Sequence, residues 1–286
     1  MVMVARSPML GASPGPMPMS PPMRTPRPNK RIVLIRHGRT FMNERLAAPG
    51  SRWGDPGFTD VFDDDDAHFF RDSPLSPAGE RQARRLAARL GGEAFGGDEP
   101  PADEEREALR DVGLVVCSPL SRACQTAELA LLPHLGRGVP AVALPLASER
   151  LYLVSDLGRP SSEMTRSFPW IDFGPCADRE GEGDGPSSWW YVHPDGEEYA
   201  EWRPTGEGQT YACWGEPEEP FARRMEALHD WLGARPERTI ALVCHWGVLD
   251  WLTGEDFANC EMRVVGFDQL RRTGAGKETE QPDEGA

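Results

Sequence analysis

The chain has 286 residues, of which 46 are acidic and 31 are Lys or Arg, and its formal net charge is −15. Because binding to a nucleic-acid backbone depends on clustered Lys and Arg, this balance argues against a nucleic-acid partner. No apolar stretch approaches the ~20 residues of a membrane span. The six cysteines form no CxxC pair, which predicts a reduced, intracellular protein.

The two ends of the chain differ in composition from the rest. Residues 1–30 are rich in Met, Pro and Ser and contain no acidic residue. This composition is typical of an organellar transit peptide, but the prolines oppose an amphipathic helix and equally favour a disordered leader. The protein is therefore expected to be cytoplasmic, or organellar if the leader is a transit peptide. Residues 271–286 are predicted to be an acidic disordered tail, which leaves 31–270 as one domain.

The first predicted element is a strand at 31–35, an apolar, β-branched run that ends on Arg36, His37 and Gly38. The next is a helix at 77–90, preceded by Ser76, a good N-cap. Residues 92–111 are rich in Gly and acids and predict an excursion on the surface.

Further elements alternate in type as far as residue 144. A strand is predicted at 112–117, followed by a helix that opens at Ser118 and Pro119, passes through Arg122 and reaches about Leu132. A short strand is predicted at 141–144. Such alternation is typical of a mostly parallel sheet covered by helices.

The periodicity fails at about 150–218, a segment that holds five of the nine tryptophans. So many tryptophans argue against disorder, and we expect an elaborated lid beside the functional site. Whether these tryptophans line a substrate or form a buried aromatic cluster is open.

The last elements are a helix at 219–234, with apolar residues at helical spacing, and strands at 239–244 and 263–267. The predicted fold class is α/β, a three-layer α/β/α arrangement with a mostly parallel sheet and a Trp-rich insertion.

Residues suited to phosphoryl transfer follow four of the strand-like runs. They are Arg36 with His37, Arg122, Glu149 and His245. Because parallel strands present their carboxyl ends at one edge of a sheet, these side chains are expected to meet there. A neutral imidazole can attack phosphorus, arginines pair bidentately with phosphate, and a carboxyl group of raised pKa can protonate a leaving oxygen. His37 is thus the candidate nucleophile and Glu149 the candidate acid, with Glu163 as its competitor.

Several motifs together resemble the histidine phosphatase superfamily, in its phosphoglycerate mutase-like branch. They are Arg-His-Gly-x-Thr-x-x-Asn at 36–43, Pro-Leu-Ser-Pro-x-Gly-x-x-Gln-Ala at 74–83, Ser-Pro-Leu-x-Arg-Ala-x-Gln-Thr-Ala at 118–127, Glu149 and Val-x-His at 243–245. The resemblance covers most of residues 31–270. It implies phosphorylation of His37, and a phosphate pocket formed by Arg36, Arg122 and His245. It also implies Asn43 as a polar support, which could instead merely cap a turn, Glu149 as proton donor, and no required metal.

Two positions depart from the pattern that the resemblance implies. Trp246 follows His245 where the family usually has a small residue, so we expect the pocket floor to be narrowed or reshaped and count Trp246 among the substrate-binding residues. Arg39 follows Gly38 where the cofactor-dependent mutases typically have Glu, and their extended motif is missing. Arg39 and the missing extended motif both favour hydrolysis over a mutase reaction.

Other chemistries lack a matching pattern. No HExxH or paired ligand spacing indicates zinc, and no Gly-rich loop precedes Lys-Ser or Lys-Thr, so neither a metal nor another cofactor is expected. Four residues separate Cys117 from Arg122, where a cysteine-phosphatase loop needs five. The sequence therefore predicts a metal-independent phosphatase acting on a small phosphomonoester. The alternatives are a phosphomutase using the same phosphohistidine and a non-catalytic module that binds a phosphorylated ligand; the oligomeric state is left open.

Overall fold

The computed structural model describes residues 29–50, 70–92, 102–136, 138–180, 188–191 and 216–273. The predicted leader before residue 29, the tail after residue 273, and Trp202 and Trp214 lie outside the described residues. In the part that is described, no helix has the length and apolar character needed to cross a membrane.

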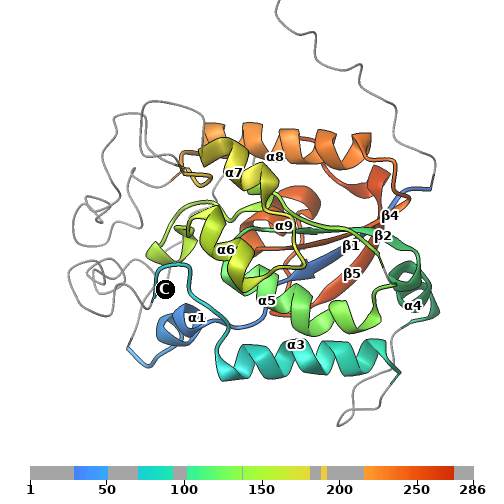
Figure 1. The fold of residues 1–286 in the computed structure, drawn as a ribbon, viewed down its shortest axis with the longest axis horizontal. Coiled ribbons are helices and arrows are strands. Elements are labelled where there is room, and N and C mark those ends of the chain that lie inside the picture. The colour runs from blue at the N-terminus through green and yellow to red at the C-terminus, as the bar shows by residue number, and fades with distance from the viewer. Residues whose placement is uncertain are drawn as a thin grey trace, which may run out of the picture.

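Five strands form one sheet in the order β3-β2-β4-β1-β5 (Figure 1). Their bounds are β1 Arg31–Arg36, β2 Val112–Cys117, β3 Ala141–Ala143, β4 Thr239–Cys244 and β5 Met262–Gly266. β1, β4, β2 and β3 are parallel and only β5, at the edge, is antiparallel. The predicted, mostly parallel sheet is therefore confirmed.

Helices cover both faces of the sheet, as Figure 1 shows with α8 along the top and α3 along the bottom. One apolar core joins Val33 and Ile35 of β1 to helices α3 and α5, and the other joins Ile32 and Leu34 to helices α8 and α9. The helix bounds are α1 Phe41–Leu46, α3 Pro77–Leu90, α4 Asp103–Arg110, α5 Ser121–Ala130, α6 Ser161–Ser167, α7 Gly174–Glu180, α8 Glu218–Ala234 and α9 Trp246–Thr253. Because alternate residues of a strand face opposite sides, this pattern gives the predicted three layers.

Two sequence predictions for the middle of the chain need correction. The excursion predicted at 92–111 contains α4, which buries Ala108 and Leu109 and begins with three acidic residues that suit a helix N-terminus. The helix predicted from Ser118 begins at Ser121 instead, because the backbone N–H of Ser118 still donates to Val243 of β4 over 2.9 Å.

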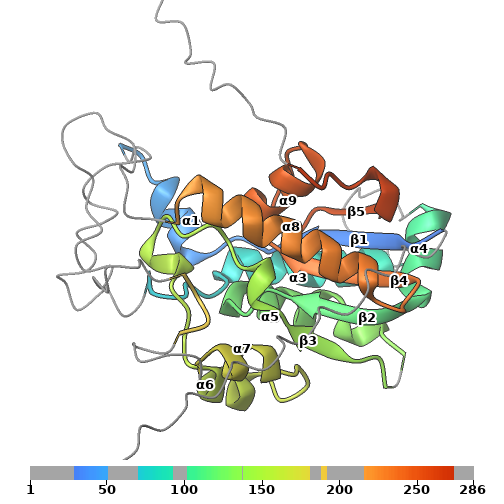
Figure 2. The same ribbon diagram turned by 90° about the horizontal axis from the view of Figure 1, so that it is seen from above.

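The described part of the insertion is also more regular than the sequence predicts. It contains α6 and α7, which lie side by side near the β3 edge in Figure 2, and Met164 of α6 is buried against the main core. Trp189 is buried in the same core and donates its indole N–H to the carbonyl oxygen of Arg159 over 2.8 Å. The two helices are too short for a clear 3.6-residue repeat, which explains why the pattern failed there.

The loop after β1 approaches the first turn of α3 very closely. A Cβ atom on Gly79 would overlap the carbonyl oxygen of Arg39 and lie 2.8 Å from its carbonyl carbon. A Cβ atom on Gly38 would lie 2.9 Å from the carbonyl oxygen of Gly79. Two glycines of the motifs at 36–43 and 74–83 thus allow the backbone beside His37 to pack against α3.

We expect Gly79→Ala to lower the free energy of unfolding by about 2 kcal/mol or more, because the added methyl group meets backbone that cannot rotate away. This loss would occur although alanine favours a helix over glycine by about 1 kcal/mol. The matched control is Gly136→Ala, whose Cβ would meet, among the described residues, only Val139, at 3.8 Å. Urea unfolding of both variants measures the difference, and equal stability would contradict the close approach.

Candidate active site

A cavity of about 380 Å³ opens at the carboxyl ends of β1 and β4. The sequence-predicted residues that line it are Arg36, His37, Asn43, Arg122, Glu149 and Trp246. The register explains this convergence: Arg36 pairs with Cys244, so His37 and His245 follow their strands at the same level. Residues more than 200 positions apart in the chain therefore meet at one edge of the sheet.

His37 is buried and its ring is fixed by one hydrogen bond. Its Nδ1 lies 2.7 Å from the carbonyl oxygen of Gly38, which can only accept, so Nδ1 carries the proton and Nε2 keeps its lone pair. Burial lowers the pKa of His37 well below its usual value, and the positive charges of Arg122 and Arg36 lower it further. A neutral imidazole with a free Nε2 is the form that a nucleophile requires.

His245 lies behind the cavity rather than on its wall. Its ring centroid is 5.0 Å from that of His37 and its side chain has no exposed surface. Its Nδ1 accepts from Nε of Arg122 over 3.2 Å, and its Nε2 lies 2.7 Å from Oγ of Ser118. Burial lowers its pKa well below the usual value, so it is neutral. With both ring nitrogens engaged, His245 positions Arg122 in this structure and does not line the expected phosphate pocket.

Arg122 lies in the first turn of α5 and is only 4% exposed. Besides His245, its guanidinium donates to the carbonyl oxygen of Ser155 and, over 2.8 Å, to Oδ1 of Asp156. A guanidinium with three fixed partners keeps one orientation, and its charge stays beside His37.

Arg36 is half-buried at the end of β1. One of its terminal nitrogens donates to the carbonyl oxygen of Phe257, while its Nε is buried without a hydrogen-bond partner in the part of the chain that the structure describes. Because this Nε is buried, Arg36 acts on the cavity through its positive charge, which is close enough to lower the pKa of His37.

Asp156 is a site residue that the sequence prediction missed. It is 6% exposed, lines the cavity, and accepts from the backbone N–H groups of Tyr152 and Leu153 as well as from Arg122. It belongs to a single 3₁₀ turn, Val154–Asp156, inside the aperiodic insertion. Nothing in the local pattern separates it from the many other acids of this chain.

Glu149 lines the same cavity and both its oxygens are engaged. Oε1 accepts from the N–H of Arg150 over 2.9 Å and Oε2 from that of Gly247 over 3.1 Å. Burial, and then the negative charge of Asp156, raise the pKa of Glu149 to about 7, against the opposing effect of those two hydrogen bonds and of Arg122. A carboxyl group with this pKa can give and take a proton near neutral pH.

Glu163, the other proton donor considered from the sequence, is exposed on α6 and does not line the cavity. The structure therefore removes Glu163 as the alternative proton donor, and Asp156 takes its place as the second carboxyl group near the nucleophile.

Asn43 lines the cavity and also belongs to the capping box at the N-terminus of α1. Its Oδ1 accepts from the N–H of Thr40 over 3.1 Å, while its own backbone N–H donates to the Thr40 hydroxyl. Trp246 is 45% exposed, so it lies at the rim of the cavity and not on its floor, and its indole N–H donates to Asp256 over 2.6 Å. The prediction that Trp246 shapes the pocket floor is wrong, because α9 begins at Trp246 and places Gly247, not the indole, against Glu149.

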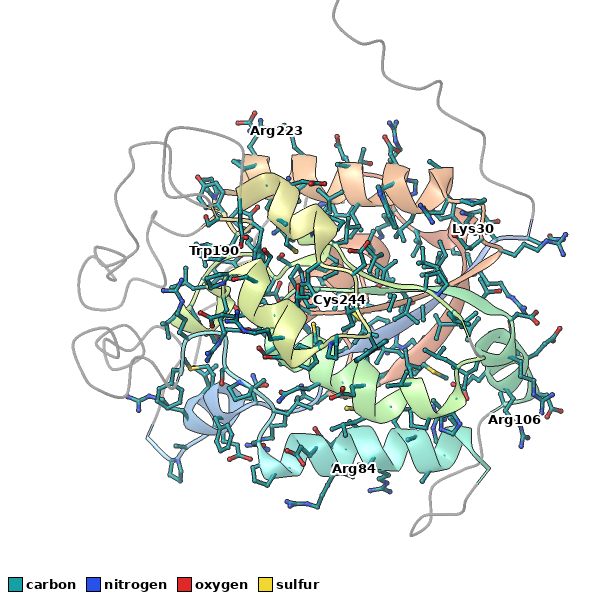
Figure 3. The ribbon with its side chains drawn as sticks, viewed as in Figure 1. Lys30, Arg84, Arg106, Trp190, Arg223 and Cys244 are labelled. Carbon is teal, nitrogen blue, oxygen red and sulfur yellow. The ribbon has the colours of Figure 1, made fainter. Side chains whose placement is uncertain are left out.

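The cysteines that the structure describes offer no competing nucleophile. Burial raises the pKa of Cys117 to about 12 and also raises that of Cys244, which Figure 3 places in the middle of the structure. Thiols with such pKa values remain protonated and unreactive at neutral pH. Among the described residues, no group of three or more His, Cys, Asp and Glu could hold a metal ion.

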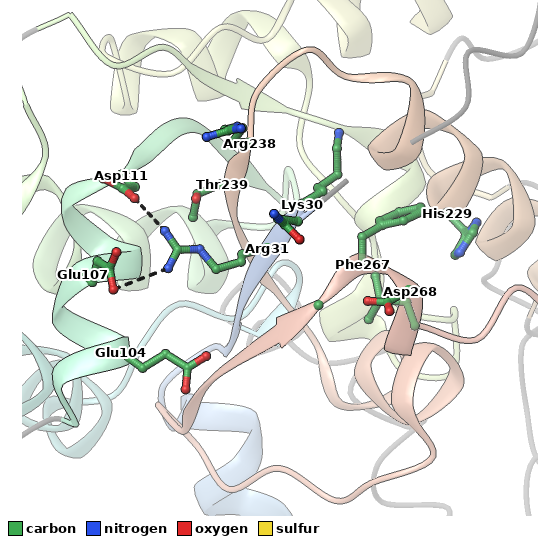
Figure 4. Close-up of a pocket in the computed structure, with 13 residues that line it drawn as sticks. Lys30, Arg31, Glu104, Glu107, Asp111, His229, Arg238, Thr239, Phe267 and Asp268 are labelled. Atoms are coloured by element: carbon green, nitrogen blue, oxygen red, sulfur yellow. Dashed lines mark hydrogen bonds and ion pairs between the residues drawn. The ribbon is translucent and has the colours of Figure 1, made fainter. Parts of the chain in front are cut away.

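A larger cavity, of about 940 Å³, lies at the opposite, amino-terminal end of β1 and β4 (Figure 4). Its Arg31 is paired with Asp111 at 2.6 Å and lies 4.0 Å from Glu107. No residue predicted for phosphoryl transfer lines this cavity, so volume alone does not identify the site.

The tryptophans described in the insertion do not line the site cavity. Trp189 is in the core, and its ring meets that of Trp190 edge-on with centroids 5.3 Å apart. Of the two interpretations left open by the sequence, these residues favour the buried cluster. Of the described residues of the insertion, those that line the site are instead Tyr152, Leu153, Ser155 and Asp156.

No protein-family model and no curated protein matches the chain. Among solved structures, the ecdysone phosphate phosphatase from Bombix mori, in complex with tungstate, is similar at 13% identity, 85% coverage of this chain, 91% of that one, and a TM-score of 0.47. The alpha-ribazole phosphatase from Shigella flexneri is similar at 20% identity, 86% and 96% coverage, and a TM-score of 0.41. The phosphoglycerate mutase from Thermus thermophilus is similar at 19% identity, 86% and 98% coverage, and a TM-score of 0.39.

The site itself brings together the neutral, oriented His37, two arginines beside it, and a carboxyl group whose pKa is about 7.

Proposed function

We propose that this protein is a phosphatase that hydrolyses a small phosphomonoester through a phosphohistidine on His37, without a metal ion. The observation that carries the proposal is the state of His37: a neutral ring whose Nδ1 is fixed by Gly38 and whose Nε2 is left free, in a cavity shared with Arg36 and Arg122. Phosphate esters are anionic, and two arginines in one cavity supply the charge that attracts them despite the acidic chain.

In the first step, Nε2 of His37 attacks phosphorus and the bond from phosphorus to the ester oxygen breaks. Charge develops on the phosphoryl oxygens, where the positive charges of Arg36 and Arg122 stabilise it. The leaving oxygen takes the proton of Glu149, which is protonated below about pH 7. The products are an alcohol, a phosphohistidine and an ionised Glu149.

In the second step, water attacks the phosphorus of the phosphohistidine and the N–P bond breaks. The carboxylate of Glu149 accepts the proton that water loses, which restores its acid form, and Nε2 regains its lone pair. His245 keeps Arg122 oriented during both steps through the 3.2 Å hydrogen bond to its Nε.

The full chain is first assayed with an aryl phosphate, with and without EDTA. Enzyme that has been labelled by a ³²P-labelled substrate is then quenched in acid and, separately, in alkali. We expect phosphate release that EDTA does not change, and a label that is stable in alkali and labile in acid. Loss of activity on chelation with recovery on adding a divalent ion, or a label on a cysteine, would contradict the proposal. Transfer of the label to an added phosphoglycerate in preference to water would favour the phosphomutase instead.

A further inference from the structure

The wall of the catalytic cavity is largely apolar beyond its charged groups. Its apolar members come from three segments: Met42 and Leu46 from α1, Tyr152 and Leu153 from the start of the insertion, and Trp246 from α9. Met42 and Leu46 are four residues apart, so they lie on one face of the helix. These side chains, apart from Trp246, belong to one apolar cluster in which α1 packs against residues 151–157.

Trp246 extends this wall to the surface. In the described part of the chain only two large hydrophobic side chains are exposed, Leu132 at 40% and Trp246 at 45%. The hydrogen bond from the indole N–H to Asp256 holds the ring at the rim, with its polar atom satisfied within the protein. What remains is an apolar ring face at the entrance to the site, which suits contact with an apolar ligand.

The charges of the cavity point to the same kind of ligand. Among the described residues that line it, the only arginines or lysines are Arg36 and Arg122, and the proposed reaction uses both on the phosphoryl group. The carboxyl groups are Glu149 and Asp156. A second anionic group on the substrate would therefore find no further cation on the described wall and would lose its hydration without a charge to replace it.

We propose that the site selects phosphate monoesters of apolar alcohols, with the alcohol lying on the wall formed by Met42, Leu46, Tyr152, Leu153 and Trp246. This inference rests on the proposed function for its placement of the phosphoryl group between Arg36 and Arg122. It excludes short, doubly anionic substrates such as phosphorylated carboxylic acids as preferred ligands, which is a further physical argument for hydrolysis over a phosphoglycerate mutase reaction.

The test uses two inert ligands, hexylphosphonate and the phosphonate of equal chain length that ends in a carboxylate. Calorimetric titration of the full chain gives their Kd values without any turnover. Because one apolar contact is worth about 10–200-fold in a hydrophobic pocket, we expect hexylphosphonate to bind at least tenfold more tightly. Equal affinities, or tighter binding of the carboxylate-ended ligand, would overturn the inference.

Two variants locate the preference on this wall. Trp246→Ala should weaken hexylphosphonate binding several-fold with little effect on inorganic phosphate, whereas Leu132→Ala, a matched change at the other exposed hydrophobic residue, should change neither. Leu46→Lys places a cation at the last residue of α1, where the helix dipole favours it, and should raise affinity for the carboxylate-ended ligand above that for hexylphosphonate. Unchanged selectivity in both wall variants would also overturn the inference.

The same samples separate this inference from the proposed function. Hydrolysis of an aryl phosphate with equal Kd values for the two phosphonates would leave the phosphatase standing and remove the substrate class. A tenfold Kd preference in a protein that hydrolyses no aryl phosphate would keep the apolar phospho-ligand site and remove the catalytic proposal.

Discussion

His37→Ala is expected to lower kcat for any phosphomonoester by about 10⁴ or more, because no other neutral, oriented nucleophile lines the cavity among the described residues. The fold should survive. The substitution removes one hydrogen bond, from Nδ1 to the Gly38 carbonyl oxygen, worth about 1 kcal/mol. Steady-state kinetics and urea unfolding on the same preparation measure both effects.

The control is His134→Ala, since His134 lies in a 3₁₀ turn, Leu132–His134, outside the cavity. This variant should keep both activity and the phosphoenzyme label. His37→Gly gives a second, positive readout: free imidazole should restore part of the turnover by occupying the vacated space as an external nucleophile. A phosphoenzyme that persists in His37→Ala would remove His37 from the mechanism.

How much the sequence could predict depended on whether a residue is tied to a regular element. His37 and His245 follow strands with clear apolar runs, so their shared edge followed from the parallel sheet. Their different roles did not follow, because only the three-dimensional packing places the ring of His245 between Ser118 and Arg122 and away from the cavity wall.

Asp156 as a site residue and helix α4 could not be predicted from the sequence. Asp156 acts through a single 3₁₀ turn whose geometry depends on its own hydrogen bonds to Tyr152 and Leu153, a local arrangement without sequence periodicity. Helix α4 has eight residues, of which only Ala108 and Leu109 are buried, so its acidic composition masked the apolar contact that holds it in place. The place of Asp156 in the site and the formation of α4 therefore both depend on tertiary packing.

Glu149→Gln is expected to slow hydrolysis of alkyl phosphates by about 10²–10⁴, because their alkoxide leaving groups need a proton that an amide cannot supply. Aryl phosphates with a leaving group of low pKa should be affected much less. In the wild type, kcat/KM for an alkyl phosphate should fall as pH rises through about 7, where burial and Asp156 have placed the pKa of Glu149. The variant should lack this alkaline limb.

The direction of the stability effect provides an independent check on the same group. Since the pKa of Glu149 is raised in the folded state, the folded protein binds more protons than the unfolded chain between pH 4.5 and about 7, and stability falls as pH rises through that window. Glu149→Gln removes this fall, although its amide must leave the N–H of Arg150 or Gly247 without an acceptor. The Tm of the variant relative to the wild type should therefore be lowest below pH 4.5, rise between pH 4.5 and about 7, and stay constant above that window.

An equal loss of activity on alkyl and aryl phosphates would mean that Glu149 only holds the cavity together. Asp156, the other carboxyl group among the described residues of its wall, would then be the donor to test.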